Sequence, residues 1–188
     1  MSDKLKKSLN YSFTNDDIKK YLPDAKIIEY NDLIEYNTID DLLPKDRDSV
    51  IMLIETDDNC GHWTSLTKDK KNNRLTFFDS YGLDIDQELK FISKIKRKLL
   101  GQERKRLTEL VDNSDYDVIY NHFPLQSHKS WVSTCGRHII NWLLQFNNGA
   151  DFEKYINLLK FMVDDKDLEH ARDLKYDLVM LSQVPKPE

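Results

Sequence analysis

The segment SVIMLIET at residues 49–56 is a continuous apolar run rich in β-branched side chains. A short run of this kind, bounded by polar residues, is typical of a strand that is buried on both faces. Such a strand belongs to the interior of a sheet, and the rest of the chain has to supply its neighbours.

The next two apolar segments predict a β-hairpin. HWTSLT at 62–67 and RLTFFDSY at 74–81 flank the polar loop KDKKNN at 68–73. If this loop is symmetric, His62 lies opposite Asp79, with Cβ atoms about 4.5–5.5 Å apart on one face of the sheet. A carboxylate there fixes the tautomer of the imidazole and leaves the other ring nitrogen for proton transfer. The alternative is an ordinary cross-strand polar pair.

The remaining segments predict several helices and one further strand from their apolar spacing and their end signals. These are helices at 15–22 (capped by Asn15 or Asp16), 38–43 (capped by Thr38), 86–100, 136–147, 151–163 and 166–174, and a strand at 117–123. Helix 136–147 is apolar nearly all round, which predicts a place in the core. The mixed order of elements predicts one α+β domain over residues 1–188, with a central, mostly antiparallel sheet flanked by helices.

The composition narrows the class of protein. The chain has 188 residues, no apolar run long enough to span a membrane and no apolar stretch of a signal peptide at its N-terminus. Its two cysteines, Cys60 and Cys135, are too few for a disulfide framework and predict free thiols in a reducing environment. We therefore expect a monomer that is not secreted and does not contact a membrane.

One basic segment stands out from the net charge of −5. Residues 94–106, KIKRKLLGQERKR, carry seven Lys or Arg against one Glu. The segment predicts the solvated face of a helix, with a weak nucleic-acid contact through Lys94–Arg106 as the alternative.

Cys135 directly precedes the apolar helix. The first turn of a helix has unpaired backbone donors and a positive dipole end, which favour the reactive thiolate and can hold an oxyanion. Gly136 leaves room for a substrate backbone, and the amide of Gln126 upstream is a candidate second oxyanion donor. The alternative is a buried, inert cysteine at the start of a core helix.

Two other uses of the cysteines have to be considered. Cys60, His62, Cys135 and His138 provide the donor types of a zinc site, although the spacing C-x-H is tighter than usual. Cys60 beside Gly61 is a second candidate nucleophile, but no helix follows it.

Four motifs together resemble a known family. GHW at 61–63, FFDSYG at 77–82, a glutamine upstream and STCG at 133–136 are similar to adenovirus-type maturation proteases and to the SUMO- and ubiquitin-like-protein proteases. The similarity covers residues 49 to 147. These are cysteine peptidases of the papain-like superfamily with a permuted order of catalytic residues: His, Asp, Gln, Cys.

The resemblance assigns a role to each matching residue. His62 matches the general base, Asp79 its orienting acid, Gln126 the oxyanion donor and Cys135 the nucleophile. Trp63 matches an aromatic that covers the channel for small substrate residues. This chain departs from the family in the segment between Gln126 and Cys135, which is longer than the usual compact turn.

The resemblance also implies a function. We expect a cysteine endopeptidase, without cofactor or metal, that processes viral capsid precursors after small residues such as Gly. It would act in the virion, or in the host-cell cytoplasm or viral factory. The alternatives are a deconjugating protease for ubiquitin-like modifiers and a zinc-held, non-catalytic binding module.

Overall fold

The computed structural model describes residues 1–57, 60–166 and 168–187, and only the backbone at residues 169, 170 and 172. The chain divides into two compact units. Residues 25–122 form one, here called the sheet unit, and residues 1–24 together with 123–188 form the other, the helical unit.

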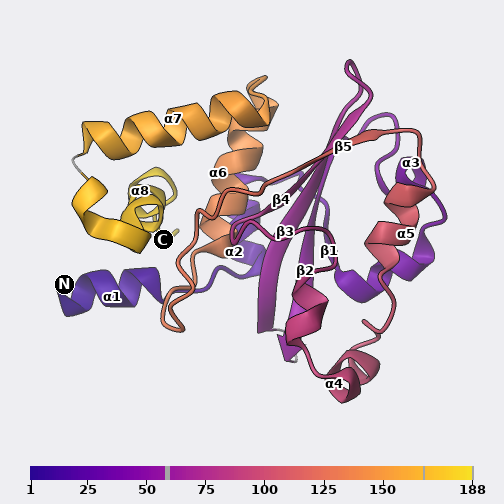
Figure 1. The fold of residues 1–188 in the computed structure, drawn as a ribbon, viewed down its shortest axis with the longest axis horizontal. Helices are drawn as coiled ribbons and strands as arrows, with labels where there is room; N and C mark the ends of the chain where they lie inside the picture. Colours follow the sequence, from indigo (N-terminus) through magenta and orange to yellow (C-terminus); the bar gives the residue numbers. More distant parts are fainter. Residues whose placement is uncertain (58–59, 167, 188) are drawn as a thin grey trace. The chain divides into compact units, whose positions relative to one another are not determined.

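The sheet unit is built on five strands in the order β1-β2-β3-β4-β5. These are β1 (Ile27–Glu29), β2 (Ser49–Asp57), β3 (Cys60–Asp69), β4 (Arg74–Asp79) and β5 (Asp117–Tyr120) (Figure 1). The expected α+β class is confirmed, but the sheet is mixed: β2, β3 and β4 are antiparallel, whereas β1 and β5 run parallel to their neighbours. Each parallel edge strand is joined to its neighbour through helical segments, because a parallel connection needs a crossover.

The hairpin forms, with a register different from the expected one. Thr64, not His62, lies opposite Asp79, because the strands continue to a pair between Asp69 and Arg74. The Asp69 carboxylate closes the turn by accepting hydrogen bonds from the backbone of the two residues Lys71 and Asn72. The register therefore moves by two residues, which keeps every side chain on its expected face.

The core of the sheet unit covers one face of the sheet. Val50, Met52 and Ile54 alternate along β2 and are buried with Leu66 of β3 and Phe77 of β4. Short helices pack on this face: η1 (Tyr30–Glu35), α3 (Ile39–Leu42), η2 (Glu88–Phe91) and α5 (Arg106–Asp112). Thr38 caps α3 as expected.

The helix expected over 86–100 is wrong. The segment instead forms η2 and the separate α4 (Lys94–Leu99), because Ile92 is extended and the Ser93 hydroxyl caps a new helix by accepting from the Lys96 backbone. The apolar spacing predicted one helix with a buried face, but the apolar residues in the second half of the segment are not buried. Ile95 is 77% exposed and Leu99 is 79% exposed.

The helical unit contains six helices among its described residues. They are α1 (Asp3–Leu9), α2 (Asn15–Tyr21), α6 (Cys135–Asn147), α7 (Phe152–Asp165), η3 (Glu169–Leu174) and α8 (Lys175–Gln183). Helix α6 contacts α2, α7 and α8, and its residues Cys135 to Leu143 are all buried, as expected. The cap of α2 is Thr14, in a capping box with Asp17, and not Asn15 or Asp16. In the described parts of the chain, no helix has both the length and the apolarity for a membrane span.

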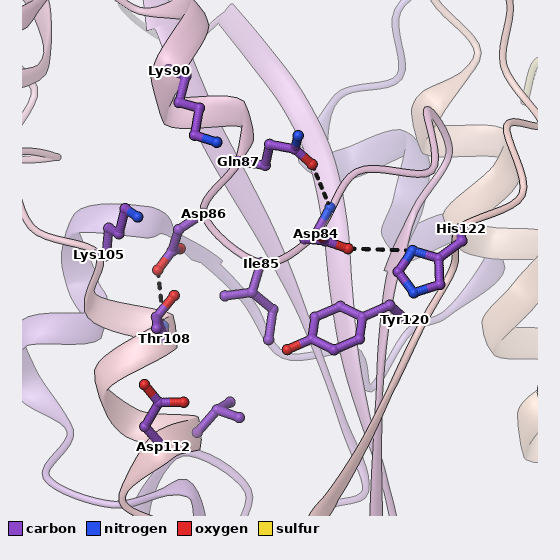
Figure 2. A pocket seen from close by; sticks show the side chains of 11 residues that line it. Asp84, Ile85, Asp86, Gln87, Lys90, Lys105, Thr108, Asp112, Tyr120 and His122 are labelled. Atoms are coloured by element: carbon purple, nitrogen blue, oxygen red, sulfur yellow. Dashed lines mark hydrogen bonds and ion pairs between the residues drawn. The ribbon is translucent and has the colours of Figure 1, made fainter.

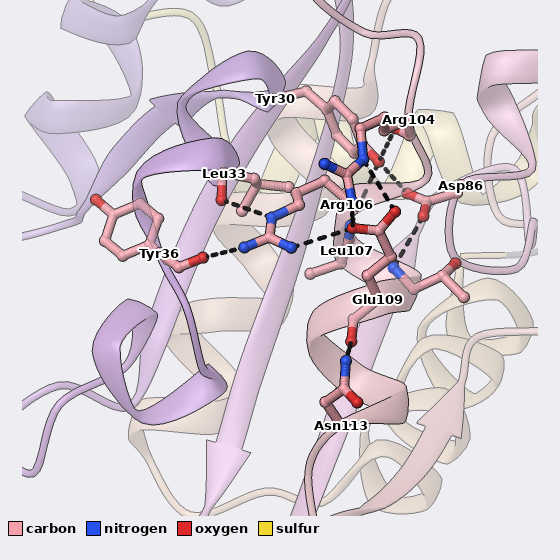
Figure 3. A network of polar contacts seen from close by, with 10 residues as sticks. Tyr30, Leu33, Tyr36, Asp86, Arg104, Arg106, Leu107, Glu109 and Asn113 are labelled. Atoms are coloured by element: carbon pink, nitrogen blue, oxygen red, sulfur yellow. Dashed lines mark hydrogen bonds and ion pairs between the residues drawn. The ribbon is translucent and has the colours of Figure 1, made fainter.

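A polar network ties η1 to α5 inside the sheet unit (Figure 3). The Tyr30 hydroxyl donates to Asp86 Oδ1 at 2.7 Å and accepts from the Leu107 backbone at 3.4 Å. Asp86 Oδ2 accepts from the Thr108 backbone at 2.9 Å. Burial raises the pKa of Tyr30, so its hydroxyl remains a donor at neutral pH.

We expect the substitution Tyr30→Phe to lower the free energy of unfolding by about 1–3 kcal/mol, because it leaves a buried carboxylate without this donor. Chemical denaturation followed by circular dichroism measures the change. Tyr36→Phe is the matched control, since the Tyr36 hydroxyl makes no hydrogen bond among the described residues. Equal losses in the two variants would contradict the role assigned to the Tyr30 hydroxyl.

Candidate functional site

His62 and Asp79 meet in the sheet unit. His62 Nε2 lies 3.1 Å from Asp79 Oδ1, and the two residues are 4% and 1% exposed. They lie on the same face as Leu66 and Phe77, at the end of the sheet where β3 begins and β4 stops. The shift in register makes the contact diagonal, within reach of long side chains.

Two further residues, which the sequence patterns did not single out, hold this pair. The Tyr81 backbone donates to Asp79 Oδ1 at 2.7 Å, and the Tyr81 ring stacks on the His62 ring with centroids 4.6 Å apart. The side-chain amide of Asn121 donates to the Asp79 carbonyl. Because Asp79 accepts at Nε2, that nitrogen carries the hydrogen, and Nδ1 is the nitrogen suited to exchange a proton with a nucleophile.

Trp63 follows His62 on β3, so its side chain points to the opposite face of the sheet. It pairs with Leu53 of β2 and is buried. The role of Trp63 in substrate binding stays a prediction.

Cys135 is the first residue of α6 in the helical unit and is 8% exposed. Thr134 occupies the N-cap position, but its side chain makes no capping hydrogen bond. The first-turn backbone donors beside Cys135 and Gly136 are therefore not used by a cap side chain. This is the arrangement in which a helix start can stabilise a thiolate or an oxyanion.

Gln126 lies in the same unit, on the segment that leads to Cys135. Its side chain is buried, and Nε2 donates to the Val132 carbonyl at 3.2 Å. This bond closes the segment into a compact loop, although the segment is longer than the resemblance implies. Its role as an oxyanion donor stays a prediction.

The two histidines of the expected zinc alternative, His62 and His138, each lie against a buried aspartate. His138 Nε2 lies 3.1 Å from Asp177 Oδ1, and both side chains are fully buried. Among residues 1–57, 60–166 and 168–187, no group of three or more His, Cys, Asp or Glu is placed to hold a metal ion.

The basic segment 94–106 does not form one helix face. Lys96 pairs with Asp57, and Arg104 and Arg106 both pair with Glu109. These cations are part of the polar contacts of the sheet unit, and the nucleic-acid contact stays a prediction.

A cavity of about 450 Å³ opens between the loop after β4, α5 and the end of β5 (Figure 2). Lys90 and Lys105 lie near Asp86 in this view, and His122 pairs with Asp84 at 3.3 Å. Burial raises the pKa of the Asp86 carboxyl above its ordinary value. The sequence patterns gave no signal for this cavity, because its lining residues come from three separate segments.

Fold and site define an α+β protein with a buried His–Asp pair on a hairpin and a cysteine at the start of a core helix. No protein-family model matches the chain. The chain is 34% identical over 148 residues to the uncharacterized protein V9 of Sputnik virophage, and the alignment covers 78% of this chain and 83% of V9. The chain belongs to the same family as V9.

Among solved structures, the chain is similar to the effector protein RickCE of Rickettsia bellii, with a TM-score of 0.38 and 19% sequence identity. The similarity covers 84% of this chain, which spans 57% of the length of the RickCE chain. At this TM-score the likeness supports no conclusion about function.

We expect Asp86→Asn to flatten the pH dependence of stability. Because the pKa of Asp86 is raised by folding, the folded state binds its proton more tightly than the unfolded state. This contribution is present below the unfolded-state pKa and is lost as the pH rises through the folded-state pKa. Denaturation between about pH 4 and pH 7 should therefore show wild type losing stability relative to Asp86→Asn. Parallel curves for the two proteins would refute the expectation.

Proposed function

We propose that this protein is a cysteine endopeptidase in which Cys135 is the nucleophile, His62 the general base and Asp79 its orienting acid. The observation that carries the proposal is the buried His62–Asp79 contact of 3.1 Å, because it presents an imidazole held in one tautomer. Two further observations support it: Cys135 begins α6, and Gln126 lies on the segment that leads to it.

The reaction proceeds through a thioester. His62 Nδ1 takes the proton of the Cys135 thiol, and the sulfur attacks the carbonyl carbon of the scissile bond. The Cys135 backbone N–H and the Gln126 amide donate to the oxyanion. Breakage of the C–N bond releases the amine, which receives its proton from His62. Water, deprotonated by His62, then cleaves the thioester, which releases the acid product and restores the thiol.

The substrate in this proposal is a virion precursor protein that is cut after small residues such as Gly. The similarity to a virophage protein supports a viral setting. Gly136 supports small residues at the scissile bond, because a glycine beside the nucleophile leaves space for a closely approaching backbone. The enzyme would act during maturation of particles, in the virion or in the viral factory.

We expect Cys135→Ala to abolish cleavage of a capsid precursor by the purified protein, as followed by gel electrophoresis and mass spectrometry. Cys60→Ser is the matched control and should retain full activity, because Cys60 is exposed and does not begin a helix. Full activity in Cys135→Ala would end the proposal.

Proximity of the thiol and the imidazole has its own test. The reagent 1,3-dibromoacetone should join Cys135 to His62 in the Cys60→Ser protein, and peptide mapping identifies the crosslink. If the reagent modifies Cys135 but forms no crosslink to His62, His62 is not the general base. A second labelling experiment separates the two candidate substrates. If an electrophile carried by a whole ubiquitin-like modifier labels Cys135, and one carried by a short Gly-Gly peptide does not, the function is deconjugation and not capsid processing.

We expect Gln126→Ala to lower kcat by about 10²–10³, the usual cost of losing one oxyanion donor. Thermal unfolding of the same variant separates this effect from loss of the bond to Val132. An unchanged kcat in a folded Gln126→Ala protein would assign the oxyanion to other donors.

A further inference from the structure

A second buried His–Asp pair lies in the helical unit and plays no part in the mechanism above. Asp177 of α8 and His138 of α6 are both fully buried. Asp177 accepts from three groups: the Ser127 backbone to Oδ2 at 2.9 Å, the Thr134 hydroxyl to Oδ1, and His138 Nε2 to Oδ1 at 3.1 Å.

The hydrogen-bond pattern defines the donor and acceptor roles in this pair. All three partners act as donors, which suits an ionised carboxylate because it only accepts. Nδ1 of His138 has no hydrogen-bond partner among the described residues. A proton on Nδ1 would be a buried donor without an acceptor, so the hydrogen of the ring is assigned to Nε2, where Asp177 accepts it.

The positions of the donors connect this carboxylate to the candidate site. Ser127 directly follows Gln126, and Thr134 directly precedes Cys135. One buried side chain therefore fixes both ends of the segment that joins the expected oxyanion donor to the expected nucleophile. Among the described residues, no other side chain accepts hydrogen bonds from both Ser127 and Thr134.

The same contact explains why the N-cap of α6 is unusual. A threonine at an N-cap normally accepts from the backbone N–H groups of the first helical turn. The Thr134 hydroxyl instead donates to Asp177, and it makes no capping bond. The first-turn donors beside Cys135 consequently are not taken by a cap.

We propose that Asp177, supported by His138, is a positioning residue that holds Gln126 and Cys135 relative to each other and turns the Thr134 hydroxyl away from the α6 donors. The effect on catalysis rests on the proposed peptidase function. The effect on the segment 127–134 does not, and can be measured without a substrate.

The experiment compares four variants in the Cys60→Ser protein. Asp177→Asn removes an acceptor, and Thr134→Val removes the hydroxyl with little change in shape. Thr134→Ser restores a hydroxyl. Asp173→Asn is the matched control, because Asp173 also accepts from Ser127, through its side chain at 3.2 Å, but is exposed.

The first readout is amide hydrogen exchange at residues 127–134. We expect faster exchange in Asp177→Asn and Thr134→Val, and wild-type exchange in Thr134→Ser and Asp173→Asn. Thermal unfolding identifies any variant that fails to fold, and Thr134→Val then decides the outcome. Unchanged exchange in a folded Thr134→Val protein overturns the proposal.

The second readout is the kinetics of a fluorogenic peptide with two glycines before the scissile bond. We expect Thr134→Val to lower kcat by roughly tenfold to a hundredfold with little change in KM, and Thr134→Ser to restore it. An equal loss in Thr134→Val and Thr134→Ser, or a change in KM alone, overturns the positioning role. If wild type and Cys135→Ala cleave alike, the peptidase proposal fails while the exchange result still decides what Asp177 holds.

Discussion

The cost of burying a carboxylate is the constraint on which this structure depends. Asp79, Asp86 and Asp177 are each at most 2% exposed, and each accepts hydrogen bonds from segments far away in the sequence. A buried carboxyl group of this kind is stabilised by the hydrogen bonds that it accepts. Each aspartate therefore fixes the place of the segments that donate to it. One holds an imidazole, one joins η1 to α5, and one holds the loop that leads into α6.

The two groups of residues in the proposed peptidase are built by different means. In the sheet unit, strand alternation and a tight turn bring an imidazole to a carboxylate, and Tyr81 stacks on the ring. In the helical unit, the start of a buried helix presents a cysteine, and hydrogen bonds to side chains hold the preceding loop. A hairpin sets its pair through local geometry, whereas the loop needs a partner from α8, far along the chain.

Periodicity predicted elements well where burial was uniform and poorly where it was not. Residues 50–55 of β2 and residues 135–143 of α6 are all buried, so their patterns predicted their structure correctly. The apolar pattern of 86–100 combined two buried residues with two exposed ones, and the helical segment ended at Ile92. The three-residue β1 has too few side chains to show any period, so only its pairing with β2 defines it as a strand.

The sequence by itself determined that His62 and Asp79 share a face, because side chains alternate along a strand, and that a helix starts next to Cys135, because apolar residues recur there with a helical period. It also indicated the four residues of the proposed peptidase site. Only the tertiary structure decided the hairpin register, the stacking of Tyr81 on His62 and the hydrogen bond from the Thr134 hydroxyl to Asp177. These contacts join residues whose separation follows no period. They depend on how buried polar groups find partners in the folded chain, which is a property of packing and not of local pattern.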